Sequence, residues 1–242
     1  MLSRAAAVIV LCLGFVATAP GPKDDSLNHY LDLMLDNLEV LIIENGLDPT
    51  PLPNGTVGFS DVVLGVTWQG EAAVYDGSLR GLSSIYRTGD AEFLHDGNGF
   101  INGISANLGL GDMEAHYTLL AEFMDLGPVA DVVVDINGAS IYFEASLDRT
   151  TCHFHVSIME VTDIGHISVN ITGLGLLDWI VEIVVDLVVN IIKGFIKDTV
   201  EGVILNLTNQ VLDGLDLGVL GPLIGCDAVA HPFIQPRLVH AK

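Results

Sequence analysis

The feature that most constrains the fold is a long apolar stretch that begins near Leu176 and ends near Leu212. A narrow polar stripe of helical period runs through it, because residues three or four apart share one face of a helix. Nearly every other position is apolar, so a helix here must be covered on most of its circumference. The stretch predicts a C-terminal helix of about 50 Å at 1.5 Å per residue. The stripe consists of Asp178, Glu182, Asp186, Asn190, Lys193, Lys197 and Glu201.

This helix does not have the composition of a membrane span. A charged or polar side chain arrives at every turn, and charges at the centre of a bilayer cost about 3 kcal/mol each. A strand is excluded as well, because the many β-branched residues do not alternate at a period of two. We therefore expect no stable membrane insertion, and the helix needs an apolar cover from the chain itself.

A region of period two, from about Val57 to Thr172, can supply that cover. Apolar and polar residues alternate in several runs, which predicts an antiparallel meander with one apolar face. Glycines within the runs indicate bends and strong coiling of the sheet. Turn signals of the kind that suit tight hairpins separate the runs. They are Asp76-Gly77, Asp96-Gly97-Asn98-Gly99, Gly111-Asp112, Gly127-Pro128, Asn137-Gly138 and Asp163-Ile164-Gly165.

A first helix is predicted from Ser26 to Asn45, where apolar residues recur at steps of four and three and polar residues occupy the opposite face. Gly46 can end this helix, and the prolines that follow forbid its continuation. The fold class is therefore α+β. We expect a strongly curved antiparallel sheet wrapped around one long C-terminal helix, plus an N-terminal amphipathic helix.

The N-terminus predicts secretion. Arg4 precedes an apolar run, and small residues follow it, which is typical of a signal peptide. We assign residues 1–19 to this signal, with the cleavage point left open because Pro20 is unfavourable just after a cut. Residues 24–242 are expected to form a single domain, and 50% hydrophobic residues indicate a large core. The formal net charge of −22 argues against a nucleic-acid partner.

Two cysteines remain after the signal peptide, Cys152 and Cys226. An oxidising compartment favours one disulfide between them, and two separate free thiols are the alternative. Three Asn-x-Thr sequons, at Asn54, Asn170 and Asn206, are candidate glycosylation sites in a secreted chain.

Signatures of enzymatic chemistry are missing from the sequence. It has no Gly-x-Ser-x-Gly nucleophile motif and no pair of carboxylates that stands out as an acid and base couple. His153 and His155 share one face of a predicted strand, but that face is out of phase with the apolar residues, so we interpret them as solvent-facing and not as metal ligands. The sequence predicts no enzyme, no cofactor and no metal.

The excess of apolar surface around one helix leaves two interpretations open. The helix and sheet pack as a solid core, or the wrapped sheet leaves an apolar cavity for a ligand. For the second case, we expect a cavity lined by residues of the long helix, of the strands and of the first helix. The candidates are Met34, Leu38, Leu119, Phe123, Phe143, Phe154, Ile183, Leu187, Ile191 and Phe195.

Several short motifs, taken in this order, resemble the group 7 mite allergens and their arthropod relatives. They are Gly46-Leu47-Asp48-Pro49 with Leu52-Pro53, Leu79-Arg80-Gly81-Leu82, Arg87-Thr88-Gly89-Asp90-Ala91, Leu176-Leu177-Asp178 and Lys197-Asp198-Thr199-Val200. Those allergens are grouped with bactericidal/permeability-increasing protein and with juvenile-hormone-binding and takeout proteins in the tubular lipid-binding superfamily. The resemblance covers nearly the whole mature chain. It implies half of a super-roll, in which one sheet coils around a helix and encloses an apolar ligand site.

The functional expectation is a secreted carrier or sensor of a lipid or another apolar small molecule, taken up mainly by apolar burial. The alternative is an extracellular protein-interaction module with a solid core and no ligand, in which the exposed stripe of the first helix binds a protein partner.

Overall fold

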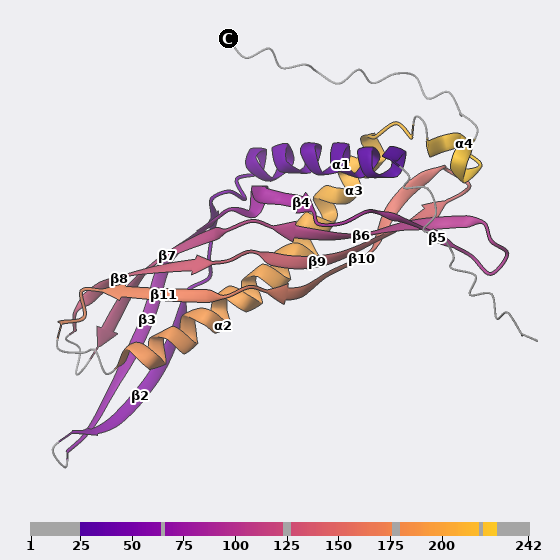
Figure 1. Cartoon of the computed structure of the whole chain (residues 1–242). Coiled ribbons are helices and arrows are strands. Elements are labelled where there is room, and N and C mark those ends of the chain that lie inside the picture. Colours follow the sequence, from indigo (N-terminus) through magenta and orange to yellow (C-terminus); the bar gives the residue numbers. More distant parts are fainter. Residues whose placement is uncertain (1–24, 64–65, 123–126, 176–179, 218–219, 227–242) are drawn as a thin grey trace, which may run out of the picture.

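The computed structural model describes residues 25–63, 66–122, 127–175, 180–217 and 220–226. The predicted signal peptide and the predicted cavity residue Phe123 lie outside these residues. Figure 1 shows an elongated α+β molecule in which strands surround one long helical run.

Helix α1 extends from Asp25 to Glu44 and buries one stripe of apolar side chains, as its period predicts. Its C-terminus has the two hydrogen bonds of a Schellman motif. The backbone N–H of Gly46 donates to the carbonyl of Ile43 (3.0 Å), and that of Leu47 donates to Ile42 (2.9 Å). Gly46 has φ 69°, a left-handed conformation that glycine adopts without strain.

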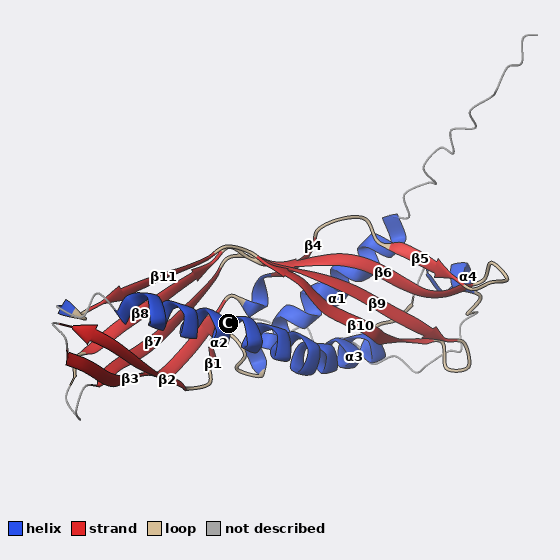
Figure 2. Ribbon diagram, turned by 90° about the horizontal axis from the view of Figure 1, so that it is seen from below, coloured by secondary structure: helices blue, strands red, loops and turns tan. Residues whose placement is uncertain are grey.

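The strands form two antiparallel sheets. In the first sheet the order is β1-β3-β7-β8-β11, with β2 also paired to β3, and in the second it is β10-β9-β6-β4, with β5 paired to β6. Figure 2 shows the two sheets end to end along the molecule. The bounds are β1 Thr50–Pro51, β2 Gly55–Val63, β3 Val66–Arg80, β4 Ile85–Arg87, β5 Glu92–His95, β6 Ile101–Leu110, β7 Met113–Glu122, β8 Val129–Ile136, β9 Ala139–Asp148, β10 His153–Ile164 and β11 Ile167–Thr172.

Four long strands pass from one sheet to the other at a common line, which we call the waist (Figure 2). The crossings are β3 to β4 through the short 3-10 helix η1 (Leu82–Ser84), β6 to β7, β8 to β9, and β10 to β11. Neighbouring crossings are hydrogen-bonded. The N–H of Gly165 donates to the Gly138 carbonyl (3.0 Å), and the N–H of Asn137 donates to the His166 carbonyl (3.0 Å).

Four of the six predicted hairpins are therefore wrong. The turn signal at Asp76-Gly77 lies inside β3, where it marks only an irregularity in the pairing with β7. The turn signals at Gly111-Asp112, Asn137-Gly138 and Gly165 mark places where a strand bends into the other sheet, so the flanking strands do not pair with each other. Glycine is needed there because the backbones approach closely. A Cβ at Gly138 would lie 2.6 Å from the carbonyl oxygen of Leu110, and Gly138 also has φ 75°.

The predicted long helix is confirmed as one helical run. It consists of α2 (Val181–Thr199), a π-helical turn η3 (Val200–Ile204) and α3 (Leu205–Gly214). A short helix α4 (Leu220–Ile224) follows. Within the described residues, the predicted polar stripe of α2 is exposed. The π turn was not predicted, and it lies where the polar step lengthens to five, between Glu201 and Asn206.

The helical run closes the concave side of both sheets. Helix α2 contacts β2 and β11, which are opposite edges of the first sheet, so that sheet curves around the helix. Helix α3 contacts β10 of the second sheet and also packs against α1, which in turn covers β4 and η1. A disulfide joins Cys152, in the turn before β10, to Cys226, two residues beyond α4, with a Cα–Cα distance of 5.8 Å. This confirms the predicted pairing.

Candidate functional site

The cover over α2 is sparser than the sequence predicts. One line of side chains is fully buried along the helix, and it includes Val184, Val188, Ile192 and Ile196. The residue before and the residue after each of these lie on the two flanks of that line. The apolar flank residues of α2 are only partly buried, so the helix keeps two strips of incompletely covered apolar surface.

The flank that precedes the buried line contains the helix residues predicted to line the cavity. These are Ile183, Leu187, Ile191 and Phe195, and each is partly buried against the core. This flank faces the start of β2. A side chain at Gly55 would collide with Ile191 and would touch the Cδ1 atom of Leu187 at 3.6 Å.

The other predicted cavity residues are not gathered around α2. Met34 and Leu38 are buried on α1, and Phe143 and Phe154 are buried on β9 and β10, all in the half of the molecule that contains the second sheet. Leu119 is buried on β7 of the first sheet. The structure thus divides the predicted set between the two halves, and its members outside α2 are packed core residues.

Two clefts on the described surface are candidate sites, and neither has any of these residues in its lining. The first, which we call the lysine cleft, has a volume of about 330 Å³. Its lining consists of Val161, Thr162, Asp163, Ile164, Lys193 and Lys197. The second, the distal cleft, has about 470 Å³ and lies between α4, the β5–β6 connection and the β9–β10 turn. Its lining consists of His95, Gly99, Phe100, Ile101, Arg149, Pro222, Leu223, Ile224 and Gly225.

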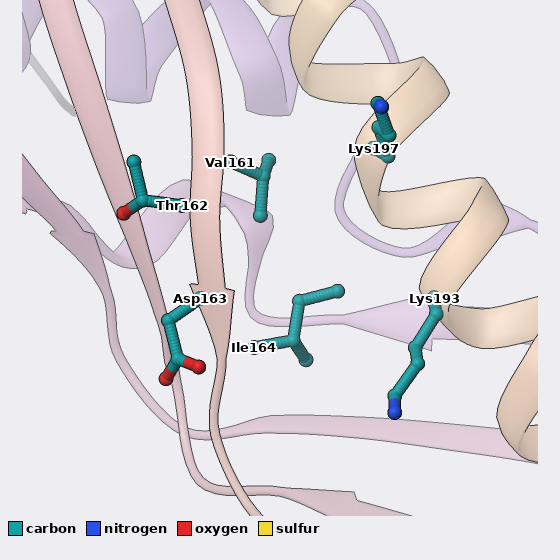
Figure 3. A pocket seen from close by; sticks show the side chains of 6 residues that line it. All are labelled: Val161, Thr162, Asp163, Ile164, Lys193 and Lys197. Carbon is teal, nitrogen blue, oxygen red and sulfur yellow. The ribbon is translucent and has the colours of Figure 1, made fainter.

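Figure 3 shows how the lysine cleft is built. Val161 and Ile164 point from the end of β10 toward α2, whereas Thr162 and Asp163 point to the other side of the strand. Lys193 and Lys197 face them from α2, one helical turn apart. Both lysines belong to the predicted polar stripe. Their position at a cleft was not predicted, because it depends on where β10 ends.

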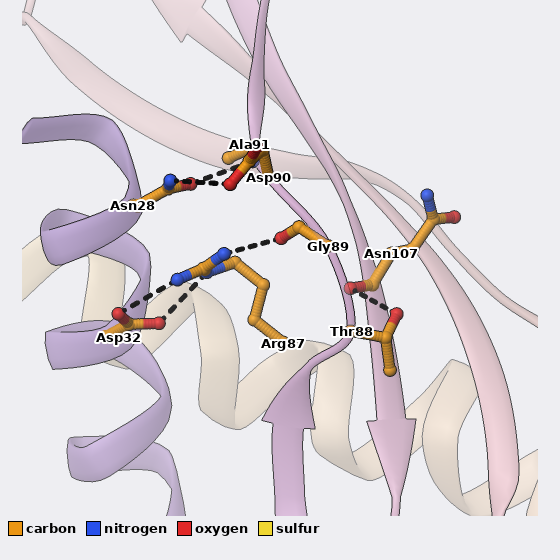
Figure 4. A network of polar contacts seen from close by, with 8 residues as sticks. All are labelled: Asn28, Asp32, Arg87, Thr88, Gly89, Asp90, Ala91 and Asn107. Carbon is orange, nitrogen blue, oxygen red and sulfur yellow. Dashed lines mark hydrogen bonds and ion pairs between the residues drawn. The ribbon is translucent and has the colours of Figure 1, made fainter. Parts of the chain in front are cut away.

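One of the family-like motifs holds α1 to the sheet (Figure 4). Arg87 donates from Nε and one terminal nitrogen to the two carboxylate oxygens of Asp32 on α1, at 3.0 and 3.1 Å, and also donates to the Gly89 carbonyl at 2.5 Å. Asn28 of α1 donates to Asp90 (3.1 Å) and accepts from the backbone N–H of Ala91 (2.9 Å). The Arg-Thr-Gly-Asp-Ala segment is therefore a docking element for the first helix.

Asp48 links the end of α1 to the waist. Its carboxylate accepts hydrogen bonds from the backbone N–H groups of Gly81 and Ser83, both at 2.9 Å, and from the Ser83 hydroxyl. Partial burial acts to raise the pKa of Asp48, but these hydrogen bonds and the charge of Arg80 outweigh it and hold that pKa below its ordinary value. These motif residues therefore have structural roles.

Two tyrosines also contribute polar groups to the interior. The hydroxyl of Tyr30 on α1 is buried and has no hydrogen-bond partner within the described residues. Burial, assisted by the charge of Asp216, raises its pKa. The Tyr117 hydroxyl donates to the carbonyl of Pro53 at 3.1 Å, and burial raises its pKa to about 12. Both groups are neutral at physiological pH.

The histidine pair on β10 does not belong to a candidate metal site within the described residues. His155 is exposed and His153 is partly buried, and the described residues contain no group of three or more His, Cys, Asp or Glu side chains that could hold a metal ion. Over the same residues, no helix has the length and apolar character needed to cross a membrane. The three sequon residues, Asn54, Asn170 and Asn206, are all exposed.

The fold and its sites define an elongated α+β protein in which curved antiparallel sheets enclose one helical run whose flanks are incompletely covered. The chain belongs to the group 7 allergen family, whose model matches residues 26–212. This agrees with the resemblance carried by the motifs.

Solved structures with a similar chain include lipopolysaccharide binding protein and Takeout 1 of Epiphyas postvittana. The first is 14% identical, with a TM-score of 0.45 over 77% of this chain and 37% of that protein. The second is 14% identical, with a TM-score of 0.38 over 77% of this chain and 92% of its own. The chain thus corresponds to little more than a third of lipopolysaccharide binding protein. No curated protein matches it.

Proposed function

We propose that the protein is a secreted, non-enzymatic carrier or sensor of an apolar small molecule. The observation that carries the proposal is the incomplete cover of α2. The helix is wrapped by the first sheet, yet its apolar flanks remain only partly buried over several turns. Contiguous apolar surface of this kind commonly marks a site for a ligand or partner.

A guest lying along α2 would remove this surface from water. Burial of apolar surface contributes about 25 cal/mol per Å², so covering even 200 Å² would contribute about 5 kcal/mol before the costs of association. The proposed site on the β2 side is the row Ile183, Leu187, Ile191 and Phe195. Because these side chains offer no hydrogen-bonding groups, they would select a guest by its shape and apolar area, which suits a carrier or sensor.

The direct test is to express the full-length chain in a eukaryotic host and collect the protein from the medium. Native mass spectrometry should detect a bound apolar molecule, and organic extraction should release it. Recovery in the medium with a processed N-terminus would support secretion. A mass decrease of individual sequon peptides after treatment with a glycosidase would show which of Asn54, Asn170 and Asn206 are modified.

Leu187→Asp should reduce ligand uptake, because it places a charge in the proposed apolar site. The matched control is Asn190→Asp, which adds the same charge to the exposed stripe of α2 and should leave uptake unchanged. Leu187→Trp, which adds volume without charge, covers the case in which the first variant does not fold. Folded Leu187 variants with unchanged uptake would rule out this row as the site.

A second candidate function is a protein-interaction module with a solid core. It is favoured by Leu33, Val40 and Ile43, which are 41%, 52% and 51% exposed on the outer side of α1. The two candidates differ in a simple way. An interaction module contains no extractable ligand, and its partner binding is lost when Val40 is replaced by Asp, whereas a carrier retains its ligand in that variant.

A further inference from the structure

The positive charges of this acidic chain are few, and most of those described are engaged. The whole chain has 9 Lys and Arg residues against 31 Asp and Glu. In the described part, Arg87 pairs with Asp32, and Arg149 donates to the Ile101 carbonyl and stacks over Phe100. The two described lysines both lie at one cleft between α2 and β10.

The lysines continue an apolar row on the flank of α2 that follows the buried line. This row, with one residue in every four, is Val181, Val185, Val189, Lys193 and Lys197. The three valines are partly buried and the two lysines are exposed. One strip of the helix surface thus changes from apolar to cationic where α2 approaches the waist.

The strand that faces this row, β11, also presents apolar residues. Helix α2 contacts β11, where Ile167, Val169 and Ile171 are partly buried and alternate with exposed polar residues. The apolar residues continue into the lysine cleft through Val161 and Ile164, which also pack against the core. The seam between α2 and β11 is therefore apolar along its length and ends at two ammonium groups.

We propose that this seam binds an anionic amphiphile, with its carboxylate at Lys193 and Lys197 and its hydrocarbon chain along Val189, Val185 and Val181. Hydrogen bonds between ammonium and carboxylate groups are stronger than neutral ones. The cleft, at about 330 Å³, is at the small end of ligand sites, so it holds the head group and the first carbons while the chain lies in the seam. The 12 residues from Val181 to Lys193 span about 18 Å.

Other charges at the cleft limit the head group to a single negative charge. The ammonium group of Lys197 also pairs with the carboxylate of Glu201, at 3.8 Å. Asp163 is in the lining, although its carboxylate points away from α2 (Figure 3). Lys193 has no ion pair or hydrogen bond within the described residues, so it is the main contact. A doubly charged phosphate monoester would meet these carboxylates and is disfavoured.

The test compares two probes with the same chain, dodecanoate and dodecanol, by calorimetry below their aggregation concentrations and at low salt. The proposal rests on the proposed function only in that the guest is apolar, and dodecanol alone tests that. We expect dodecanoate to bind about tenfold more tightly than dodecanol, although the net negative charge of the protein repels the anion. Acetate has the same carboxylate but no long hydrocarbon chain, so it should not bind measurably.

Variants separate the head site from the chain site. Lys193→Gln combined with Lys197→Gln should remove the tenfold preference and leave dodecanol binding unchanged, which also shows that the variant is folded. The Arg pair at the same positions should retain the preference. Val189→Asp should weaken both probes.

Three results would overturn the proposal. One is equal affinity of the wild type for the two probes, and another is a preference that survives in the double Gln variant. The third is unchanged binding in folded Val189→Asp. If neither probe binds the wild type, the seam proposal fails, whereas the carrier function is decided separately by native mass spectrometry and organic extraction of the secreted protein.

Discussion

Removal of the disulfide should cause a large loss of stability. Cys152 and Cys226 are 74 residues apart, and the segment between them contains β10, β11, α2 and α3. The bond therefore closes a loop that includes the whole helical run and two of the edge strands that it contacts, β10 and β11. We consider the double variant Cys152→Ser/Cys226→Ser, which replaces both sulfurs by small polar groups and leaves no unpaired thiol.

The expected loss follows from the chain entropy of the unfolded state. Closing a loop of about 75 residues lowers that entropy by about 15 cal/mol/K, so the crosslink stabilises the fold by about 4.5 kcal/mol at 25 °C. The entropy of unfolding is about 2.1 cal/mol/K per residue, or about 0.4 kcal/mol/K for roughly 200 ordered residues. The midpoint of thermal unfolding should therefore decrease by about 10 °C.

Urea unfolding followed by far-ultraviolet circular dichroism measures this loss. The oxidised wild type is compared with the double variant and with wild type reduced by dithiothreitol, whose unfolding curve should coincide with that of the variant. Dithiothreitol should leave the variant unchanged, which controls for effects of the reductant. A loss below about 1 kcal/mol would show that loop closure is not the source of the stabilisation.

Three further predictions concern the connections described above. Hydrogen bonds lower the folded-state pKa of Asp48. The ionised carboxylate should therefore contribute its full stabilisation above the unfolded-state pKa of about 3.9, and this stabilisation should be lost as the pH falls further. Asp48→Asn should accordingly make the free energy of unfolding, measured in urea, less dependent on pH below about 4. Arg87→Lys keeps the charge but loses the two-pronged contact with Asp32, so it should cost about 1 kcal/mol, and a double-mutant cycle with Asp32→Ala should reveal the coupling. Gly138→Ala should cost more than Gly99→Ala, because both glycines have positive φ but only Gly138 would place its Cβ against a carbonyl oxygen; equal losses of stability would contradict the close-approach argument.

The sequence predicts the elements well where a single period extends over many residues. The polar step of four identifies the run that contains α2, and the alternating residues identify the strands, because burial of one face imposes those periods. The disulfide was predictable for a different reason, since Cys152 and Cys226 are the two cysteines outside the predicted signal peptide.

Prediction from the sequence fails where the same local backbone conformation is compatible with two topologies. Asn137-Gly138 supplies the positive φ that a tight hairpin needs, but the same φ allows a strand to bend across the waist. Only contacts with distant segments, such as that between Gly165 and Gly138, distinguish the two cases. The lysine cleft was missed for the same reason, whereas the π turn left a signal in the five-residue step from Glu201 to Asn206.

Because each long strand crosses the waist, its register is fixed by pairing with neighbours in both sheets. Because β6 and β7 are one continuous path, a slip of β7 by one residue requires either a matching slip of β6 or an extra residue at Gly111. A one-residue shift turns every apolar side chain of a strand to the opposite face. Deletion of a single residue at a crossing would therefore keep that strand in register on one side of the waist and turn its side chains to the wrong face on the other. The crossings should thus tolerate changes of length less well than the outer loops.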